Sequence, residues 1–402
     1  MELQCAIQNY HWGKKGLLSS VARLIKASNP NIAIDDNKPY AELWMGTHPS
    51  GPSSIRKTNE SLVEFINNNN DVLGDEVKKT FGDSLPFLFK ILSIATSLSI
   101  QAHPDKKRAE ILNKLQPNVY KDPNHKPEIA IALTKFEALC GFRPVSEIQY
   151  FLKSVPELCM VIGDDIANEF IGSDEANCRI NLRKCLEGLL THHADSTADR
   201  LKNYLERLRQ MDECSREEMN AHLFERLHAD FPGDVGCFGI YFFNYVTLKP
   251  GEAIYLSPDE PHAYLSGDCV ECMACSDNVV RAGLTPKLKD VPTLVEMLTY
   301  KCEPGFEKYF KSTKIDEFTE IFRPPIKDFA VAKIEILSST TTYTLSPQNS
   351  AGILIIIEGK IQVNSNIYNE GSVLFIKSKE QLNLKILSEN KRTLMFEAFA
   401  NV

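Results

Sequence analysis

The sequence predicts a mainly β protein that is interrupted by an all-α insertion, and three observations support this prediction. Short apolar runs bounded by glycine and proline turns recur in residues 1–143 and 236–402, a pattern that is typical of strands. Residues 144–235 instead repeat apolar side chains at the spacing of helices. The chain has 402 residues, which is too long for one ordinary hydrophobic core, so more than one domain is expected.

Strands are expected to dominate the first part of the chain. Residues 85–94 form a nearly continuous apolar run, and residues 129–142 continue the pattern after a proline-rich turn. Lys90 interrupts the first run, so its side chain either extends to an edge or faces a polar cavity. Trp12 and Trp44 belong to an aromatic, turn-rich opening segment, where they are either core residues or the wall of a pocket.

The insertion, residues 144–235, carries local signals of helix starts. Ser146 with Gln149, and Ser215 with Glu218, have the spacing of capping boxes. No candidate catalytic group stands out in this segment. We therefore expect a structural or lid role for it.

The chain after residue 236 returns to strands. A Pro-Gly turn, a short strand and then Pro258, Pro261 and His262 resemble the second motif of the cupin family, in which a histidine enters the mouth of a jelly-roll barrel. No histidine follows His262, so the tail is expected to form a second jelly roll that is free of metal.

These patterns predict two cupin-type jelly-roll domains and one all-α domain. The catalytic jelly roll is expected to be discontinuous, with residues 1–143 and 236–300. The helical insertion then comprises residues 144–235, and the metal-free jelly roll residues 301–402.

Composition excludes several classes of function. The net charge of −8 disfavours a binder of nucleic acid or of an anionic membrane surface, although it allows a local basic pocket for a phosphorylated metabolite. No secretory signal is evident, and the eleven cysteines form no paired framework, which predicts free thiols and a cytoplasmic location. Cys269, Cys272 and Cys275 have the spacing of half a zinc site, but no fourth ligand lies nearby, so buried thiols are the better interpretation.

Four polar residues at predicted strand ends are candidate metal ligands. Prolines hold the chain extended beside three of them, which presents their side chains at the mouth of a sheet. Two imidazoles, a carboxylate and an amide oxygen suit a borderline divalent ion, zinc above all, with room left for water or substrate. A purely hydrogen-bonding role is the alternative. The four residues are Gln101, His103, Glu128 and His262.

Two stretches, residues 120–128 and 262–287, closely resemble the two signatures of the type I phosphomannose isomerase family, and residues 8–13 and 99–106 resemble the same family. The resemblance implies an enzyme with one Zn²⁺ per chain that interconverts D-mannose 6-phosphate and D-fructose 6-phosphate through a cis-enediol. It also implies a monomer that supplies mannose 6-phosphate for GDP-mannose and glycan synthesis. The family's zinc ligands fall on the four candidates above, and its catalytic arginine falls on Arg281.

Further residues are expected in the same site. Lys126 and Lys90 are candidates for acid–base catalysis or for binding the phosphate, provided that the metal and burial lower their pKa values. Ser99 is a candidate phosphate contact. Three further residues are candidate substrate contacts: Tyr264, Asp277 and Glu271. The alternative is that they only orient Arg281 and the metal ligands.

Two rival functions are compatible with the ligand pattern alone. A cupin oxygenase would use two histidines and a carboxylate to hold Fe(II), but the amide ligand Gln101 and the absence of any oxygen-linked cofactor motif argue against it. A non-catalytic jelly-roll protein would bind the hexose phosphate without exchanging its C2 proton with solvent.

Overall fold

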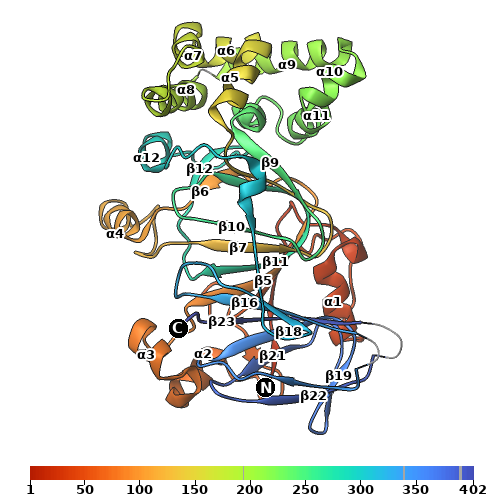
Figure 1. Cartoon of the computed structure of the whole chain (residues 1–402). Helices are drawn as coiled ribbons and strands as arrows, with labels where there is room; N and C mark the ends of the chain where they lie inside the picture. Colours follow the sequence, from red (N-terminus) through yellow and green to blue (C-terminus); the bar gives the residue numbers. More distant parts are fainter. Residues whose placement is uncertain (193, 338–339, 389–391) are drawn as a thin grey trace.

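The computed structural model describes residues 1–192, 194–337, 340–388 and 392–402, and it shows three bodies stacked along one axis (Figure 1). A helical body lies at one end, a β domain is in the middle, and a second β domain with both chain termini lies at the other end. The predicted class, mainly β with a helical insertion and two jelly rolls, is confirmed.

The central β domain is built on one branched sheet whose hub is β11 (His262–Ala274). The first part of β11 pairs with β6 and β8, and the second part pairs with β5 and β7, so one strand joins both walls of the barrel. Gly267 makes the turn between the walls: its φ is +111°, and a Cβ atom there would lie 2.4 Å from the carbonyl oxygen of Lys135. The remaining strands are β2 (Ala6–Gln8), β3 (Glu42–Met45), β5 (Phe87–Ile94), β6 (Ile100–Ala102), β7 (Glu128–Ala132), β8 (Phe136–Phe142), β9 (Phe243–Leu248), β10 (Ala253–Leu256), β12 (Val280–Gly283) and β13 (Tyr309–Phe310).

The helical body packs directly on the strands that carry the candidate site. Its apolar core continues onto Ile100 of β6, Ala263 of β11 and Val280 of β12. This continuity fixes the outer faces of those strands. The helices are α5 (Val145–Ser154), α6 (Pro156–Ile162), α7 (Asp164–Ile171), α8 (Cys178–Thr191), α9 (Ala194–Gln210), α10 (Glu213–Glu218) and α11 (Ala221–Asp230).

Both predicted capping boxes are wrong. Helix α5 begins at Val145, with Pro144 as its N-cap, so Ser146 already lies inside the first turn. The N-cap of α10 is Asp212, whose carboxylate accepts the backbone N–H of Ser215. Since an aspartate carboxylate is itself a strong cap, the helix starts earlier than the Ser-x-x-Glu spacing predicts.

Two strands from the start of the chain belong to the sheet of the C-terminal β domain. Strands β1 (Glu2–Gln4) and β4 (Ser54–Ile55) extend its eight-stranded sheet, with Leu3 opposite Val373 and Ile55. A four-stranded sheet of β17, β22, β19 and β20 faces it across a separate core. The strands are β14 (Thr313–Lys314), β15 (Thr319–Phe322), β16 (Ala330–Ile336), β17 (Thr342–Leu345), β18 (Gly352–Glu358), β19 (Ile361–Val363), β20 (Asn366–Tyr368), β21 (Val373–Ile376), β22 (Leu382–Ile386) and β23 (Thr393–Phe399).

The two β domains share one hydrophobic core. Phe89 and Cys272 from the central domain pack in the same cluster as Ile353 and Phe396 from the C-terminal domain. Cys269 belongs to a different cluster on the other face of β11, and the cysteines of the chain are free thiols, as expected.

Five α-helices of the described residues lie outside the helical insertion. One of them, α1, lies between the two aromatic stretches of the opening segment, and its N-cap is Ser19. They are α1 (Ser20–Ser28), α2 (Leu62–Asn68), α3 (Asp75–Phe81), α4 (Lys106–Leu115) and α12 (Val291–Met297). In the part of the chain that the structure describes, no helix combines the length and apolarity needed to cross a membrane.

Candidate metal and substrate site

A cavity of about 300 Å³ opens in the central β domain. Nine of the eleven predicted site residues line it: Lys90, Ser99, Gln101, Lys126, Glu128, Tyr264, Glu271, Asp277 and Arg281. The other two, His103 and His262, are buried beside Glu128. The fold therefore brings together side chains from positions 90 to 281 of the chain.

His103, Glu128 and His262 form a compact group with the spacing of a metal site. Their nearest nitrogen and oxygen atoms lie within 4.8 Å of one another. The distance from His103 Nε2 to Glu128 Oε1 is 3.5 Å, and that from His262 Nε2 to Glu128 Oε2 is 3.6 Å. His103 directly follows β6, Glu128 is the first residue of β7, and His262 is the first residue of β11.

Backbone carbonyls fix the orientation of both imidazoles. His103 Nδ1–H donates to the carbonyl oxygen of Asn278 at 2.7 Å, and His262 Nδ1–H donates to that of Glu260 at 3.0 Å. Each Nε2 atom therefore carries a lone pair directed toward Glu128. Both Nε2 atoms are buried and have no hydrogen-bond partner among the described residues, which is the state expected of ligands prepared for a cation.

Burial keeps both imidazoles neutral. Desolvation lowers the pKa of His103, and it lowers the pKa of His262 to about 4, with the neighbouring His103 acting in the same direction. Burial by itself would raise the pKa of Glu128, but Lys126 and His103 outweigh it and hold that pKa well below its usual range. Two neutral imidazoles and one carboxylate are a donor set that suits zinc.

Gln101 occupies the strand position between the metal group and Arg281. On β6 it is paired with His262 on one side and with Arg281 on the other. The hydroxyl of Ser99 donates to Gln101 Oε1 at 3.0 Å. This contact fixes the amide oxygen toward the cavity that the metal group borders.

Lys90 is held as a buried cation. Its Nζ lies 2.9 Å from Glu271 Oε2 and 3.7 Å from Glu42 Oε2. Burial alone would lower the pKa of Lys90, but the two carboxylates outweigh it and raise that pKa. The condition for proton transfer by Lys90 near neutral pH, a lowered pKa, is therefore not met.

Sheet register explains the surroundings of Lys90. On β5 it is the cross-strand partner of Trp44 on β3 and of Glu271 on β11, and its ammonium lies over the Trp44 ring at 5.4 Å. The Trp44 indole N–H donates to Glu42. Sequence reasoning missed Glu42 and left Trp44 undecided, because only the order of the strands brings them to Lys90.

Lys126 and Arg281 provide two further cations at the cavity. Lys126 Nζ lies 3.2 Å from Glu128 Oε1. Arg281 is half-buried on β12, and burial lowers its pKa, although an arginine stays charged at any physiological pH. Both cations line the cavity together with carboxylates such as Glu271 and Asp277.

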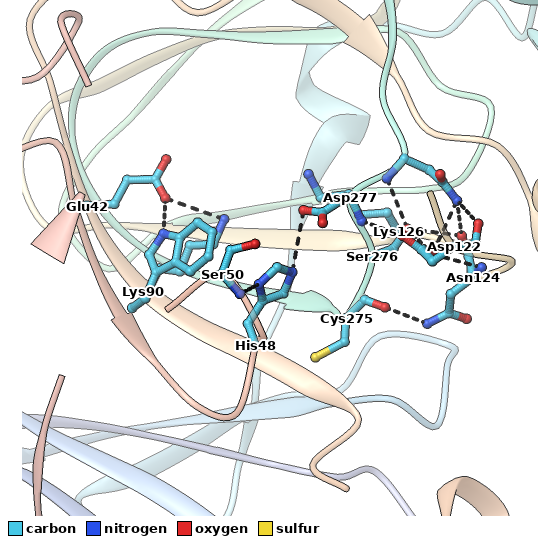
Figure 2. A network of polar contacts seen from close by, with 12 residues as sticks. Glu42, His48, Ser50, Lys90, Asp122, Asn124, Lys126, Cys275, Ser276 and Asp277 are labelled. Atoms are coloured by element: carbon cyan, nitrogen blue, oxygen red, sulfur yellow. Dashed lines mark hydrogen bonds and ion pairs between the residues drawn. The ribbon is translucent and has the colours of Figure 1, made fainter. Parts of the chain in front are cut away.

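Tyr264 and Asp277 lie on the same cavity. The Tyr264 hydroxyl is buried without a hydrogen-bond partner among the described residues, and burial raises its pKa well above 10. Asp277 Oδ1 accepts a bond from His48 Nε2 at 3.4 Å, which lowers the pKa of Asp277 (Figure 2). The Ser50 N–H donates to Nδ1 of the same imidazole.

The cavity also contains residues that the sequence did not single out as functional. Trp12 and Trp44 both line it, so the pocket-wall alternative holds for them. Lys287 lines it as well, at the end of the second signature. Phe231, which follows α11, brings the helical insertion to the cavity wall; a single phenylalanine at a helix end gives no sequence signal of that role.

Three family models match the chain. The model for the catalytic domain of type I phosphomannose isomerase matches residues 1–145, the one for its helical insertion domain matches residues 160–243, and the one for its C-terminal part matches residues 319–366. The chain is 46% identical to the mannose-6-phosphate isomerase of Homo sapiens, covering 98% of this chain and 97% of the relative. It is 40% identical to mannose-6-phosphate isomerase 1 of Arabidopsis thaliana, covering 97% and 92% of the two chains.

Solved structures agree with these sequence matches. The apo form of mannose 6-phosphate isomerase from Salmonella typhimurium superimposes with a TM-score of 0.82 at 32% identity, covering 100% of this chain and 99% of that one. A mannose 6-phosphate isomerase bound with zinc and yttrium gives a TM-score of 0.82 at 31% identity over the same shares. The chain therefore belongs to the type I phosphomannose isomerase family.

Proposed function

We propose that the protein is a zinc-dependent aldose–ketose isomerase that interconverts D-mannose 6-phosphate and D-fructose 6-phosphate. The observation that carries the proposal is the pair of buried, unpartnered histidine nitrogens that meet at Glu128, beside a cavity lined by Arg281 and Lys126. The names of the relatives supply the substrate class.

In this proposal one Zn²⁺ per chain is held by Gln101, His103, Glu128 and His262. A zinc ion bound there acts as a Lewis acid that stabilises negative charge on the oxygens of the substrate. The protein contributes the rest: it keeps both imidazoles neutral, fixes their orientation, and buries the site beneath a cavity that admits a hexose phosphate.

Isomerisation moves a proton between C2 and C1 through a cis-enediol, and charge develops on the two adjacent oxygens. In the proposal, Arg281, which lines the cavity, stabilises that charge as a permanent cation. In the proposal, Lys126 transfers a proton or binds the phosphate, and Ser99 binds the phosphate. We assign Lys90 a fixed positive charge rather than a role as base, because Glu271 and Glu42 raise its pKa.

The remaining proposals concern context. The protein would act as a cytoplasmic monomer that supplies mannose 6-phosphate for GDP-mannose and glycan synthesis. The predicted domain boundaries at residues 143, 235 and 300 also remain proposals, and the sheet pairings that cross between the β domains imply that these domains fold together.

The decisive experiment is a coupled assay of fructose 6-phosphate formation from mannose 6-phosphate, before and after chelation and after zinc is added back. Activity is expected to disappear with the metal and to return with zinc. In D₂O, deuterium should appear in the sugar at the exchanged carbon. Binding without deuterium exchange would indicate a sugar-phosphate-binding protein, and oxygen uptake with added Fe(II) would indicate an oxygenase; either result overturns the proposal.

A further inference from the structure

We infer that Asp122 is a positioning residue for the metal site, acting through the loop of residues 275–279. This inference rests on the proposed function, since it concerns the ligand role of His103. Asp122 neither lines the cavity nor belongs to the group of His103, Glu128 and His262. Its effect must therefore travel through the residues that it holds (Figure 2).

Both carboxylate oxygens of Asp122 accept hydrogen bonds from that loop. Oδ1 accepts the hydroxyl of Ser276 at 2.8 Å and the side-chain amide of Asn278 at 3.3 Å. Oδ2 accepts the backbone N–H of Asp277 at 2.8 Å. A carboxylate that accepts on both oxygens cannot be replaced by an amide without placing an N–H opposite another donor.

Backbone groups around Asp122 also bind the loop of residues 275–279. The carbonyl oxygens of Asp122 and Asn124 accept the side-chain amide of Asn278 at 2.7 and 2.9 Å. The Asn124 side chain donates to the carbonyl of Cys275 at 2.9 Å. Asn278 is completely buried, so these bonds leave its side chain little freedom.

Asn278 connects the loop to the group of candidate metal ligands. Its carbonyl oxygen accepts His103 Nδ1–H at 2.7 Å and thereby fixes which nitrogen of His103 faces Glu128. The same loop carries Asp277 into the cavity and leads directly into β12, which carries Arg281. Loosening the loop should thus affect metal affinity and turnover together.

His262 provides an internal contrast. Its Nδ1–H donates to the carbonyl of Glu260, whose carboxylate is bound by the buried Lys308. That support does not involve Asp122. Loss of the Asp122 contacts should therefore weaken one ligand and leave the other in place, so that affinity falls without being lost.

The test uses the full-length enzyme and its Asp122→Asn variant, which keeps the shape of the side chain. Zinc affinity is measured by competition with a chromophoric chelator, and the thermal unfolding midpoint of each metal-free protein is measured separately. We expect the zinc dissociation constant to rise about 10- to 100-fold in Asp122→Asn, with a lower kcat.

Asp316→Asn is the matched control. Besides the bonds described above, Asp122 Oδ1 accepts the backbone N–H of Asn124 at 2.9 Å, so Asp122 accepts two backbone N–H groups and one hydroxyl as well as the Asn278 amide. Asp316 likewise accepts two backbone N–H groups and one hydroxyl, but in the C-terminal domain; the donors are Phe318, Thr319 and Tyr343. The Asp316→Asn substitution should lower the thermal unfolding midpoint of the metal-free protein by about as much as Asp122→Asn does, and it should leave zinc affinity unchanged. Equal losses of zinc affinity in the two variants would overturn the inference, because they would show a general effect of stability.

A milder variant protects the test against misfolding. Ser276→Ala removes one donor to Asp122 and one acceptor for the Asn278 backbone N–H. It should raise the zinc dissociation constant severalfold in the same direction. Wild-type zinc affinity in both Asp122→Asn and Ser276→Ala would refute the positioning role alone, whereas a wild-type protein that binds no zinc would refute the proposed function.

Discussion

Glu128 in the central β domain and Glu397 in the C-terminal β domain are equally buried, each with 2% of its surface exposed, but their surroundings are opposite. Lys126 and His103 outweigh the effect of burial on Glu128 and lower its pKa. Glu397 lies on the same face of β23 as Met395 and Phe399, in the apolar core of the C-terminal domain. Burial raises the pKa of Glu397 to about 8.

The comparison shows what turns a buried carboxyl into a candidate site. Glu397 Oε2 has no hydrogen-bond partner among the described residues, and the carboxyl packs over Gly352, where a Cβ atom would lie 2.6 Å from Oε1. Glu128 instead has two imidazole nitrogens within 3.6 Å. Burial is common to both residues; converging donors and cations belong only to the first.

The largest expected effect comes from removing the carboxylate of the central domain. The Glu128→Ala variant should lose zinc, and its kcat should fall by about 10³-fold or more. The reason is that a bound metal would stabilise the charge developing in the transition state by several kcal/mol. Metal analysis of the purified protein and the coupled assay check both parts. Glu397→Gln serves as the control and should keep wild-type zinc content; retained zinc and activity in Glu128→Ala would refute the proposed ligand set.

The second largest effect distinguishes the contribution of the metal from that of the neighbouring Arg281 charge. Arg281→Ala should lower kcat by about 10²- to 10³-fold, the usual loss when one charge-stabilising group is removed. Its zinc content, measured by elemental analysis, should stay near that of the wild type. A variant that lost its metal would instead assign Arg281 a structural role.

The third prediction sharpens the comparison through pH. Between the unfolded pKa of Glu397, 4.5, and its folded value of about 8, the folded protein holds a proton that the unfolded chain has released. The stability of the wild type therefore falls as pH rises through this window, by about 1.4 kcal/mol per unit. Glu397→Gln cannot ionise, so near pH 7 it should be more stable than the wild type by about 3 kcal/mol.

Chemical denaturation of both proteins at pH 5, 7 and 8 checks this prediction. The difference in the free energy of unfolding should be small at pH 5 and increase with pH. A difference that stays constant with pH would show that Glu397 does not titrate in this range.

The smallest effect concerns an ion pair on the surface of the C-terminal domain. Arg392 is bound at 2.8 Å to Glu335 and to Glu358, but its side chain is 43% exposed. Arg392→Ala should reduce the free energy of unfolding by less than about 1 kcal/mol, because water screens exposed pairs. Thermal unfolding at low and high salt checks it: a loss of several kcal/mol would show that this network resembles the buried pairs around Lys90.

The sequence alone grouped the candidate metal ligands, because the signals that single them out are local. Pro104, Pro127 and Pro261 each lie beside a donor residue and hold the chain extended there, which places the donors at strand ends. The alternation between strand and helix spacing likewise predicted the helical insertion between two β regions. Cys269 and Cys272 are three positions apart, so on one strand period two assigns them to opposite faces, and they do lie in different clusters.

Only the tertiary structure decided the electrostatic state of Lys90 and the contacts of Asp122. Lys90 bonds to Glu271, 181 residues away, and Asp122 bonds to Asp277, 155 residues away. Strands β1 and β4 likewise join a sheet formed mostly by the last hundred residues of the chain. Spacing and propensity act over a few residues, whereas a pKa depends on which charges lie nearby in space. Those neighbours are set by the order in which distant strands pair, and no local pattern encodes that order.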